Sequence, residues 1–240
     1  MSANSSGPNR GLEVRSIDYV PLNERHGKVS HIGPLWFTSN AQIATLAVGL
    51  IGISTGGNLI WSLIAIVVGI LIGTLFMAAH SAQGPRLGLP QMIQSRPQFG
   101  YIGALLVWFF VFLQYAGFNV FNTILAGQAI TASVHVGSDN LWFWIVTILA
   151  VVIALFGYDF IHRFEQYLTY LIVAMLALLT VAALSKLTVP TGAFNLGGFN
   201  LVSFLGQLGV AAGFQISWAP YVSDYSRYLP ANVTRHAFRW

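Results

Sequence analysis

The sequence predicts an all-α membrane protein with about six transmembrane helices. Charged residues make up only 8% of the 240 residues and hydrophobic residues 55%, whereas an ordinary soluble domain has about 25% charged residues. A soluble protein needs charge on its surface, but the outer surface of a membrane protein faces hydrocarbon. The basic residues lie between apolar runs and form no patch, so we expect a lipid bilayer and no nucleic acid as partner.

Six apolar stretches meet, or nearly meet, the length needed to cross a bilayer. The hydrocarbon core is about 30 Å thick and requires about 20 helical residues. The stretches are residues 34–53, 59–79, 104–131, 141–158, 166–185 and 201–222. We therefore expect a cytoplasmic tail over 1–33, a six-span region over 34–222 and a cytoplasmic segment over 223–240. The Gly- and Pro-rich segment between the second and third spans should hold a short surface helix.

The basic residues indicate the orientation of the spans. With the N-terminus in the cytoplasm, ten of the 11 Lys and Arg residues fall in cytoplasmic segments, and only Lys186 falls outside. The positive-inside rule expects this asymmetry for one orientation only. We therefore predict an integral protein of the plasma (inner) membrane with a cytoplasmic N-terminus.

Two of the spans are poor hydrophobic helices. The first carries five consecutive small or polar residues, TSNAQ, at 38–42, and the sixth contains Gly206, Gly209, Gly213 and then Pro220. Relative to alanine, glycine costs about 1 kcal/mol and proline about 3 kcal/mol inside a helix. In lipid, a broken backbone is tolerated only where protein or a water-filled cavity satisfies the freed polar groups. We expect both spans to be interrupted.

The two weak spans lie five spans apart, which suits an incomplete five-plus-five inverted-repeat (LeuT-type) transporter. Interrupted helices at corresponding positions of two repeats mark the binding site in such carriers. For each span alone, the simpler explanation is that small residues let helices pack closely. The pairing favours a transporter.

The third span carries a polar stripe. Phe118 and Asn122 are four residues apart and share one face, as do Asn119 and Thr123 on the neighbouring face. An amide in hydrocarbon needs a partner, and hydrogen bonding between helices is the plain explanation. An aromatic ring beside an amide also suits a flat heteroaromatic ligand, because the ring stacks and the amide reads an N–H/C=O edge.

Four blocks of sequence carry a family resemblance. In chain order they are WFTSNAQIATLAVG, LPQMIQSRPQFGYIGA, GFNVFN and WAPYVSDYSRYLP, and the match runs from about residue 21 to the end. They resemble the purine–cytosine permease family, the first of the nucleobase–cation symporter families. The QSRPQFG and SDYSRYLP motifs are fairly specific when they occur together.

The resemblance implies a set of substrate-binding residues. An aromatic and an amide on the third span hold the nucleobase in that family, and they match Phe118 and Asn122, although the family usually has Trp where this chain has Phe118. A Trp that stacks on the other ring face matches Trp218. The polar residues at the weak point of the first span, Asn40 and Gln42, complete the candidates.

The resemblance also implies a cation site and a motif near the cytoplasm. Backbone carbonyls near Ala41 and Ala44 would help to hold a cation in sodium-coupled members, with hydroxyl ligands from a span that this sequence does not contain. Asp224, Ser226 and Arg227 match a signature that we interpret either as a structural or gating network or as a plain surface ion pair, worth about 0–1 kcal/mol.

Together, these residues and the resemblance imply a secondary active transporter that imports a nucleobase (cytosine or purines) or a related heterocycle, coupled to H⁺ or Na⁺. Which nucleobase and which ion stay open. We expect no cofactor and no enzymatic activity, because no nucleophile–base pair or metal cluster is evident. The alternatives are another small-molecule permease, a channel-like membrane protein or a non-functional fragment of a permease. Since an inverted-repeat site needs both halves, we expect a fragment of a longer transporter rather than a natural short form.

Overall fold

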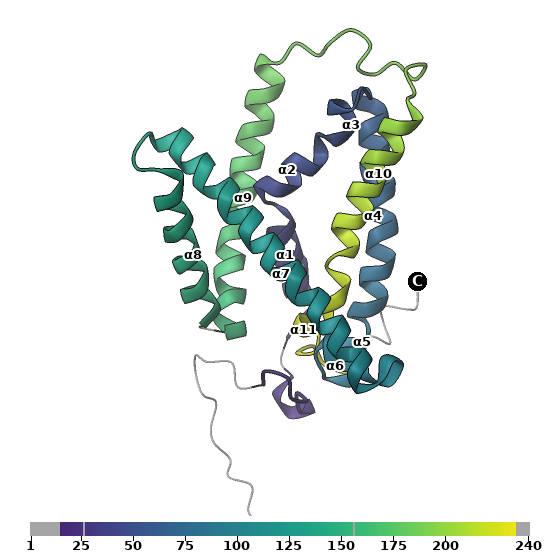
Figure 1. Ribbon diagram of the computed structural model, residues 1–240, viewed down its shortest axis with the longest axis vertical. Helices are drawn as coiled ribbons and strands as arrows, with labels where there is room; N and C mark the ends of the chain where they lie inside the picture. Colours follow the sequence, from purple (N-terminus) through teal and green to yellow (C-terminus); the bar gives the residue numbers. More distant parts are fainter. Residues whose placement is uncertain (1–14, 26, 156, 234–240) are drawn as a thin grey trace, which may run out of the picture.

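The computed structural model describes residues 15–25, 27–155 and 157–233, and over these ranges the chain forms helices and no strand (Figure 1). Residues 1–14 and 234–240, which belong to the predicted tail and end segment, lie outside the described residues. The longer helices are α1 (Val29–Asn40), α2 (Ile43–Gly49), α4 (Leu59–Ser81), α7 (Arg96–Val134), α8 (Asp139–Leu155), α9 (Gly157–Lys186) and α10 (Leu201–Ile216). The short ones are η1 (Leu22–Glu24), α3 (Ile51–Ser54), α5 (Gln83–Leu87), α6 (Gln91–Gln94), η2 (Ala219–Tyr221) and α11 (Val222–Ser226).

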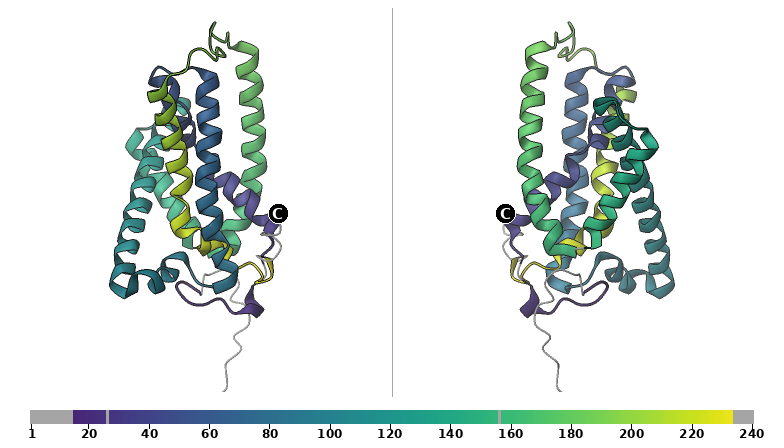
Figure 2. Two further views of the ribbon diagram at one scale, coloured as in Figure 1. Left: turned by 90° about the vertical axis from the view of Figure 1, so that its right-hand side faces the viewer. Right: turned by 90° about the vertical axis from the view of Figure 1, so that its left-hand side faces the viewer.

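Four helical stretches of the described chain are long and apolar enough to cross a membrane. They are Leu59–Leu87, Arg96–Val134, Tyr167–Lys186 and Leu201–Ser226. Of the two other predicted spans, the fourth forms the shorter apolar helix α8 and the first is broken into α1 and α2. The turn between α3 and α4 and the 187–200 connection lie at one end of the molecule, and η1, α5, α6 and α11 lie at the other (Figures 1 and 2). This arrangement is that of an integral membrane protein.

Helices α4 and α10 lie side by side and form the tightest helix pair (Figures 1 and 2). A Cβ added to Gly69 on α4 would lie 2.6 Å from the carbonyl oxygen of Leu208 on α10, and one added to Gly73 would lie 2.6 Å from the Cβ of Gln215. Small residues let two backbones approach closely where lipid provides no hydrophobic drive for association. The residues buried on α4 recur every three or four positions: Ser62, Ala65, Gly69, Gly73 and Met77.

The first membrane segment is interrupted where the sequence predicts it. Helix α1 ends at Asn40, Ala41 has φ −83° and ψ 67°, and Gln42 is extended with φ −133° and ψ 165°. Helix α2 then starts at Ile43 and runs across the middle of the molecule (Figure 1). The predicted break over residues 38–42 is therefore confirmed.

The sixth span is interrupted as predicted, but at Pro220 and not at its glycines. Helix α10 is regular through Gly206, Gly209 and Gly213, and a Cβ on any of these three would meet nothing within 4 Å. A glycine costs only about 1 kcal/mol, and in lipid the helix keeps every backbone group paired. The departure from α-helix comes later, at Ser217 and the η2 turn that contains Pro220, because proline has no N–H to donate.

Two further helices, α7 and α9, start earlier in the chain than predicted. Gly100 has φ 68° and ψ −178°, so the long straight part of α7 starts just after it, slightly ahead of the predicted start at residue 104. Helix α9 starts at Gly157, well ahead of residue 166. Hydropathy marks the part of a helix that crosses hydrocarbon, and a helix continues beyond that part wherever its backbone stays paired. In place of the one short surface helix predicted between the second and third spans there are two short helices, α5 and α6, and each is partly buried.

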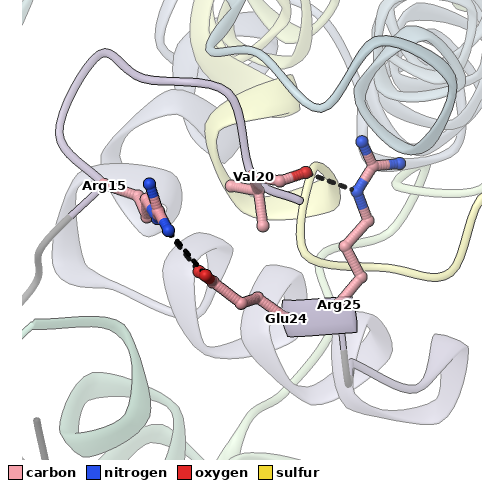
Figure 3. A network of polar contacts seen from close by, with 4 residues as sticks. All are labelled: Arg15, Val20, Glu24 and Arg25. Atoms are coloured by element: carbon pink, nitrogen blue, oxygen red, sulfur yellow. Dashed lines mark hydrogen bonds and ion pairs between the residues drawn. The ribbon is translucent and has the colours of Figure 1, made fainter. Parts of the chain in front are cut away.

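The segment before α1 is joined to α5 through Arg25, and Figure 3 shows the polar contacts within the segment itself. Arg25 is only 7% exposed and donates from Nε to the carbonyl oxygen of Val20 (2.9 Å) and from one terminal nitrogen to that of Pro85 in α5 (2.6 Å). Arg15 forms an exposed ion pair with Glu24, with 2.5 Å between nitrogen and oxygen, and this hydrogen bond lowers the pKa of Glu24.

The SDYSRYLP motif forms a buried network at the same end. Asp224 Oδ1 accepts from the backbone N–H of Gln91 (2.8 Å), and the Ser226 hydroxyl donates to the carbonyl of the last residue of α4 (2.7 Å). Arg227 is 5% exposed and donates to the carbonyl oxygen of Asp18 (3.3 Å). Of the two interpretations of this motif, these contacts support the structural network over the surface ion pair.

Candidate functional site

A cavity of about 360 Å³ lies beside the break between α1 and α2. Residues of α1, α2, α4 and α10 enclose it, and its volume falls within the roughly 300–1,000 Å³ typical of small-molecule sites. Most of the lining is apolar. The aromatic side chains of the lining are Trp36, Phe37 and Phe214, and its polar side chains besides the indole are Asn40, Thr45 and Gln215.

Asn40 links the two places where the membrane helices lose α-helical geometry. Its Nδ2 donates to the carbonyl oxygen of Trp36 (2.7 Å), and its Oδ1 accepts from the indole Nε1 of Trp218 (3.2 Å). The Thr45 hydroxyl donates to the carbonyl oxygen of Asn40 (2.5 Å). The end of α1 is therefore fixed to the residue that precedes η2. Of the residues predicted for substrate binding, Asn40 is the one that lines the cavity.

Trp218 and Phe118 lie one ring away from the cavity. The Trp218 ring centroid is 5.5 Å from that of Trp36 and 6.2 Å from that of Phe214, at interplanar angles of 68° and 85°. Phe118 meets Phe214 edge to face as well, with centroids 6.1 Å apart. Edge-to-face pairs at these distances are attractive. The structure therefore brings Phe118, Trp218 and Asn40 into one aromatic cluster around Phe214 and Trp36.

The other predicted site residues are not brought together with this cluster. Asn122 is partly exposed on α7 and does not line the cavity, and its amide has no hydrogen-bond partner within the described ranges. Gln42 stands just before α2, where its side chain does not cap the helix. Ala41 lies at the break itself, and Ala44 is 1% exposed in the first turn of α2.

Gln215 is a cavity residue that the sequence reasoning missed. It lies on α10 one turn before Trp218, and within the described part of the chain the hydrogen-bond partner of its Nε2 is the thioether sulfur of Met77 (3.2 Å). A thioether is a weak acceptor, so this amide donates a weaker hydrogen bond than the amide of Asn40. The sequence carries the signal, because an amide within an apolar span requires a partner.

A second glutamine on α10 positions the broken segment. Gln207 is 0% exposed; its Nε2 donates to the carbonyl oxygen of Val48 in α2 (3.0 Å), and its Oε1 accepts from the N–H of Gly52 in α3 (2.6 Å). Both backbone groups flank the second irregularity, at Leu50. One side chain therefore satisfies two freed backbone groups and holds α2 and α3 against α10.

Comparison with known proteins identifies the family. A family described as “Permease for cytosine/purines, uracil, thiamine, allantoin” matches residues 19–238. The chain belongs to this family. It is a family of transport proteins and not of enzymes.

Several relatives match nearly the whole chain. A Bacillus subtilis (strain 168) protein provisionally named purine-cytosine permease YxlA is 42% identical over 95% of this chain and 50% of its own length. The purine-cytosine permease fcyB of Emericella nidulans is 28% identical over 93% of this chain and 44% of its own. The purine-cytosine permease FCY2 of Saccharomyces cerevisiae is 27% identical over 93% and 43%, respectively. The chain spans about half the length of these relatives, and no solved structure matches it.

Proposed function

We propose that this chain is part of a carrier that imports a nucleobase or a related flat heterocycle, such as cytosine or a purine, driven by H⁺ or Na⁺. The family membership and the names of the relatives support the substrate class. The proposed setting is the plasma membrane with a cytoplasmic N-terminus, which the distribution of Lys and Arg supports.

The observation that carries the proposal is the composition of the cavity beside the α1–α2 break. Its aromatic side chains, Trp36, Phe37 and Phe214, suit a flat ring, since aromatic pairs add about 0.5–1.5 kcal/mol to the burial of their surface. Gln215 adds an amide whose N–H and C=O groups match the edge of a nucleobase. A ligand that replaces the weak thioether contact of Gln215 gains a stronger hydrogen bond.

Phe118, Asn122, Trp218 and Gln42 complete the proposed binding residues. Phe118 and Trp218 already contact Phe214. Alternating access moves one group of helices against another around a fixed site. We propose that such a movement of α7 relative to α10 brings Asn122 to the ligand.

We also propose the five-plus-five inverted repeat and a cation site at its first break. The contact between Asn40 and Trp218 supports the repeat, because it joins the two irregular points that such a fold pairs. The cation is assigned to backbone carbonyls near Ala41 and Ala44, because the end of α1 at Ala41 leaves carbonyl groups without intrahelical partners. Uptake should fall when the sodium or the proton gradient is collapsed; insensitivity to both would favour a passive facilitator.

Binding of radiolabelled cytosine and adenine to the purified protein, made from the complete reading frame that contains this sequence, tests the proposal. Gln215→Leu should weaken binding of the preferred base about 5- to 100-fold, because a buried ligand group left without its partner costs about 1–3 kcal/mol. Gln128→Leu is the matched control, since Gln128 is exposed on α7 and does not line the cavity. If both variants bind the base as tightly as the wild type, the base does not bind in this cavity.

A further inference from the structure

A second cavity, of about 270 Å³, lies at the end of the molecule that carries η1 and α11. It is enclosed by the end of α4, by α5 and α6, by the start of α7 and by the residues around η2. Unlike the first cavity, it is rich in amides. Its lining includes the glutamines Gln83, Gln91, Gln94 and Gln98.

Two of these glutamines have an unsatisfied group. Gln91 and Gln94 are 8% and 7% exposed, and the Oε1 atom of each is buried without a hydrogen-bond partner. The Nε2 of Gln94 donates to the carbonyl oxygen of Leu89 (2.6 Å), and that of Gln91 lies 3.4 Å from Gln83 Oε1. Buried polar atoms in folded proteins are nearly always paired, so two orphaned acceptors beside one cavity point to a missing donor.

The chemistry of the lining indicates which kind of molecule supplies the missing hydrogen-bond donor. Among the described residues, the lining contains one imidazole, that of His80, but no Asp, Glu, Lys or Arg, so an ion would lack a permanent counter-charge there. Two acceptors and several amide N–H groups match a neutral molecule that carries both donors and acceptors. The lining also includes the rings of Phe76 and Phe99, against which a flat heterocycle can pack.

The position of the second cavity relative to the first suggests a route. Ile70 of α4 lines the first cavity and His80 the second, which places them about 15 Å apart along that helix at 1.5 Å per residue. On the other side, Gln215 lines the first cavity and the next residue, Ile216, lines the second. The two cavities are therefore neighbours separated by the end of α10.

We propose that the second cavity is a distinct binding site for the transported heterocycle, in which the amides of Gln91 and Gln94 turn so that their buried Oε1 atoms accept hydrogen bonds from its N–H groups. The molecule occupies it between the first cavity and the solution at the end of the protein where η1 lies. This assignment rests on the proposed function, since it takes the same substrate class.

Equilibrium binding of radiolabelled cytosine and adenine to the purified product of the complete reading frame tests the proposal by counting sites. The wild type should bind two molecules of the preferred base per chain in two affinity classes. Gln91→Met should weaken one class about tenfold or more and leave the other unchanged, and Gln215→Leu should do the reverse. Because Gln91→Met removes an unsatisfied acceptor, its thermal stability should equal or exceed that of the wild type.

Val107→Phe provides a second variant if Gln91→Met yields no folded protein. Val107 lines the second cavity from α7, so the larger ring fills space without removing a hydrogen bond, and the same class of sites should be lost. One class of sites in the wild type, unchanged by either variant, would overturn the second site and leave the proposed function standing. Binding of neither base to the wild type would instead refute the proposed function, and the second site with it.

Discussion

Replacing Gln207 tests how the broken first segment is held in place. In Gln207→Leu the side chain keeps a similar size, but the carbonyl of Val48 and the N–H of Gly52 both lose their partner. Each buried polar group left unpaired costs about 1–3 kcal/mol in soluble proteins. In membranes the unfolded state also finds partners, and measured interhelical hydrogen bonds average only about 0.6 kcal/mol. We therefore expect a loss of about 2 kcal/mol in the free energy of unfolding.

This loss should be visible in thermal unfolding of the purified protein in detergent. For a chain of this size, 1 kcal/mol corresponds to about 2–4 °C in Tm, so Gln207→Leu should lower Tm by about 4–8 °C. Gln128→Leu, the same substitution at an exposed position on α7, serves as the control and should leave Tm within about 1–2 °C of the wild type. A Gln207→Leu variant as stable as this control would refute the view that Gln207 secures α2 and α3 to α10.

Three further substitutions test the packing and the site. Gly73→Val should lower the free energy of unfolding by about 1–3 kcal/mol, because its Cβ would lie 2.6 Å from that of Gln215. Gly206→Ala is the control: its Cβ lies in open space, so the free energy of unfolding should stay equal or rise slightly. Equal Tm values for the two variants would contradict the close packing of α4 and α10. Trp218→Ala should weaken nucleobase binding by about 1 kcal/mol or more, or at least about fivefold, and an unchanged affinity would make Trp218 a purely structural residue. Asn122→Ala should abolish cytosine or purine uptake while membrane expression stays normal, and normal uptake would remove Asn122 from the site.

The sequence predicted the interruption of the first span correctly, and in the sixth it was right about Pro220 but wrong about the glycines. Thr38, Asn40 and Gln42 are polar, and lipid cannot satisfy the hydrogen bonds of a polar run within an apolar span. Such a run therefore indicates a break that faces protein or a cavity. Glycines are less informative, because the same residue serves close packing or faces open space. Gly69 and Gly73 lie against α10, whereas Gly206 has no neighbour within 4 Å, and local sequence does not distinguish these two situations.

The surroundings of the first cavity were predictable only in part. Asn40 lines it and Phe118 and Trp218 lie one ring away, whereas the contribution of α4 was not expected. Gln215 and Gln207 were missed although each is an amide within an apolar span. Their partners, Met77, Val48 and Gly52, lie far away in the sequence, and the tertiary fold alone brings them together.

The central claim is that a flat heterocycle binds in the cavity beside the α1–α2 break. An experimental structure of the complete transporter with its preferred nucleobase tests this claim most directly. We expect ring-shaped density bordered by Trp36, Asn40 and Phe214, with the Gln215 amide turned from Met77 towards the edge of the base. Density at a place remote from all four of these side chains, with the Gln215–Met77 contact intact, would contradict it.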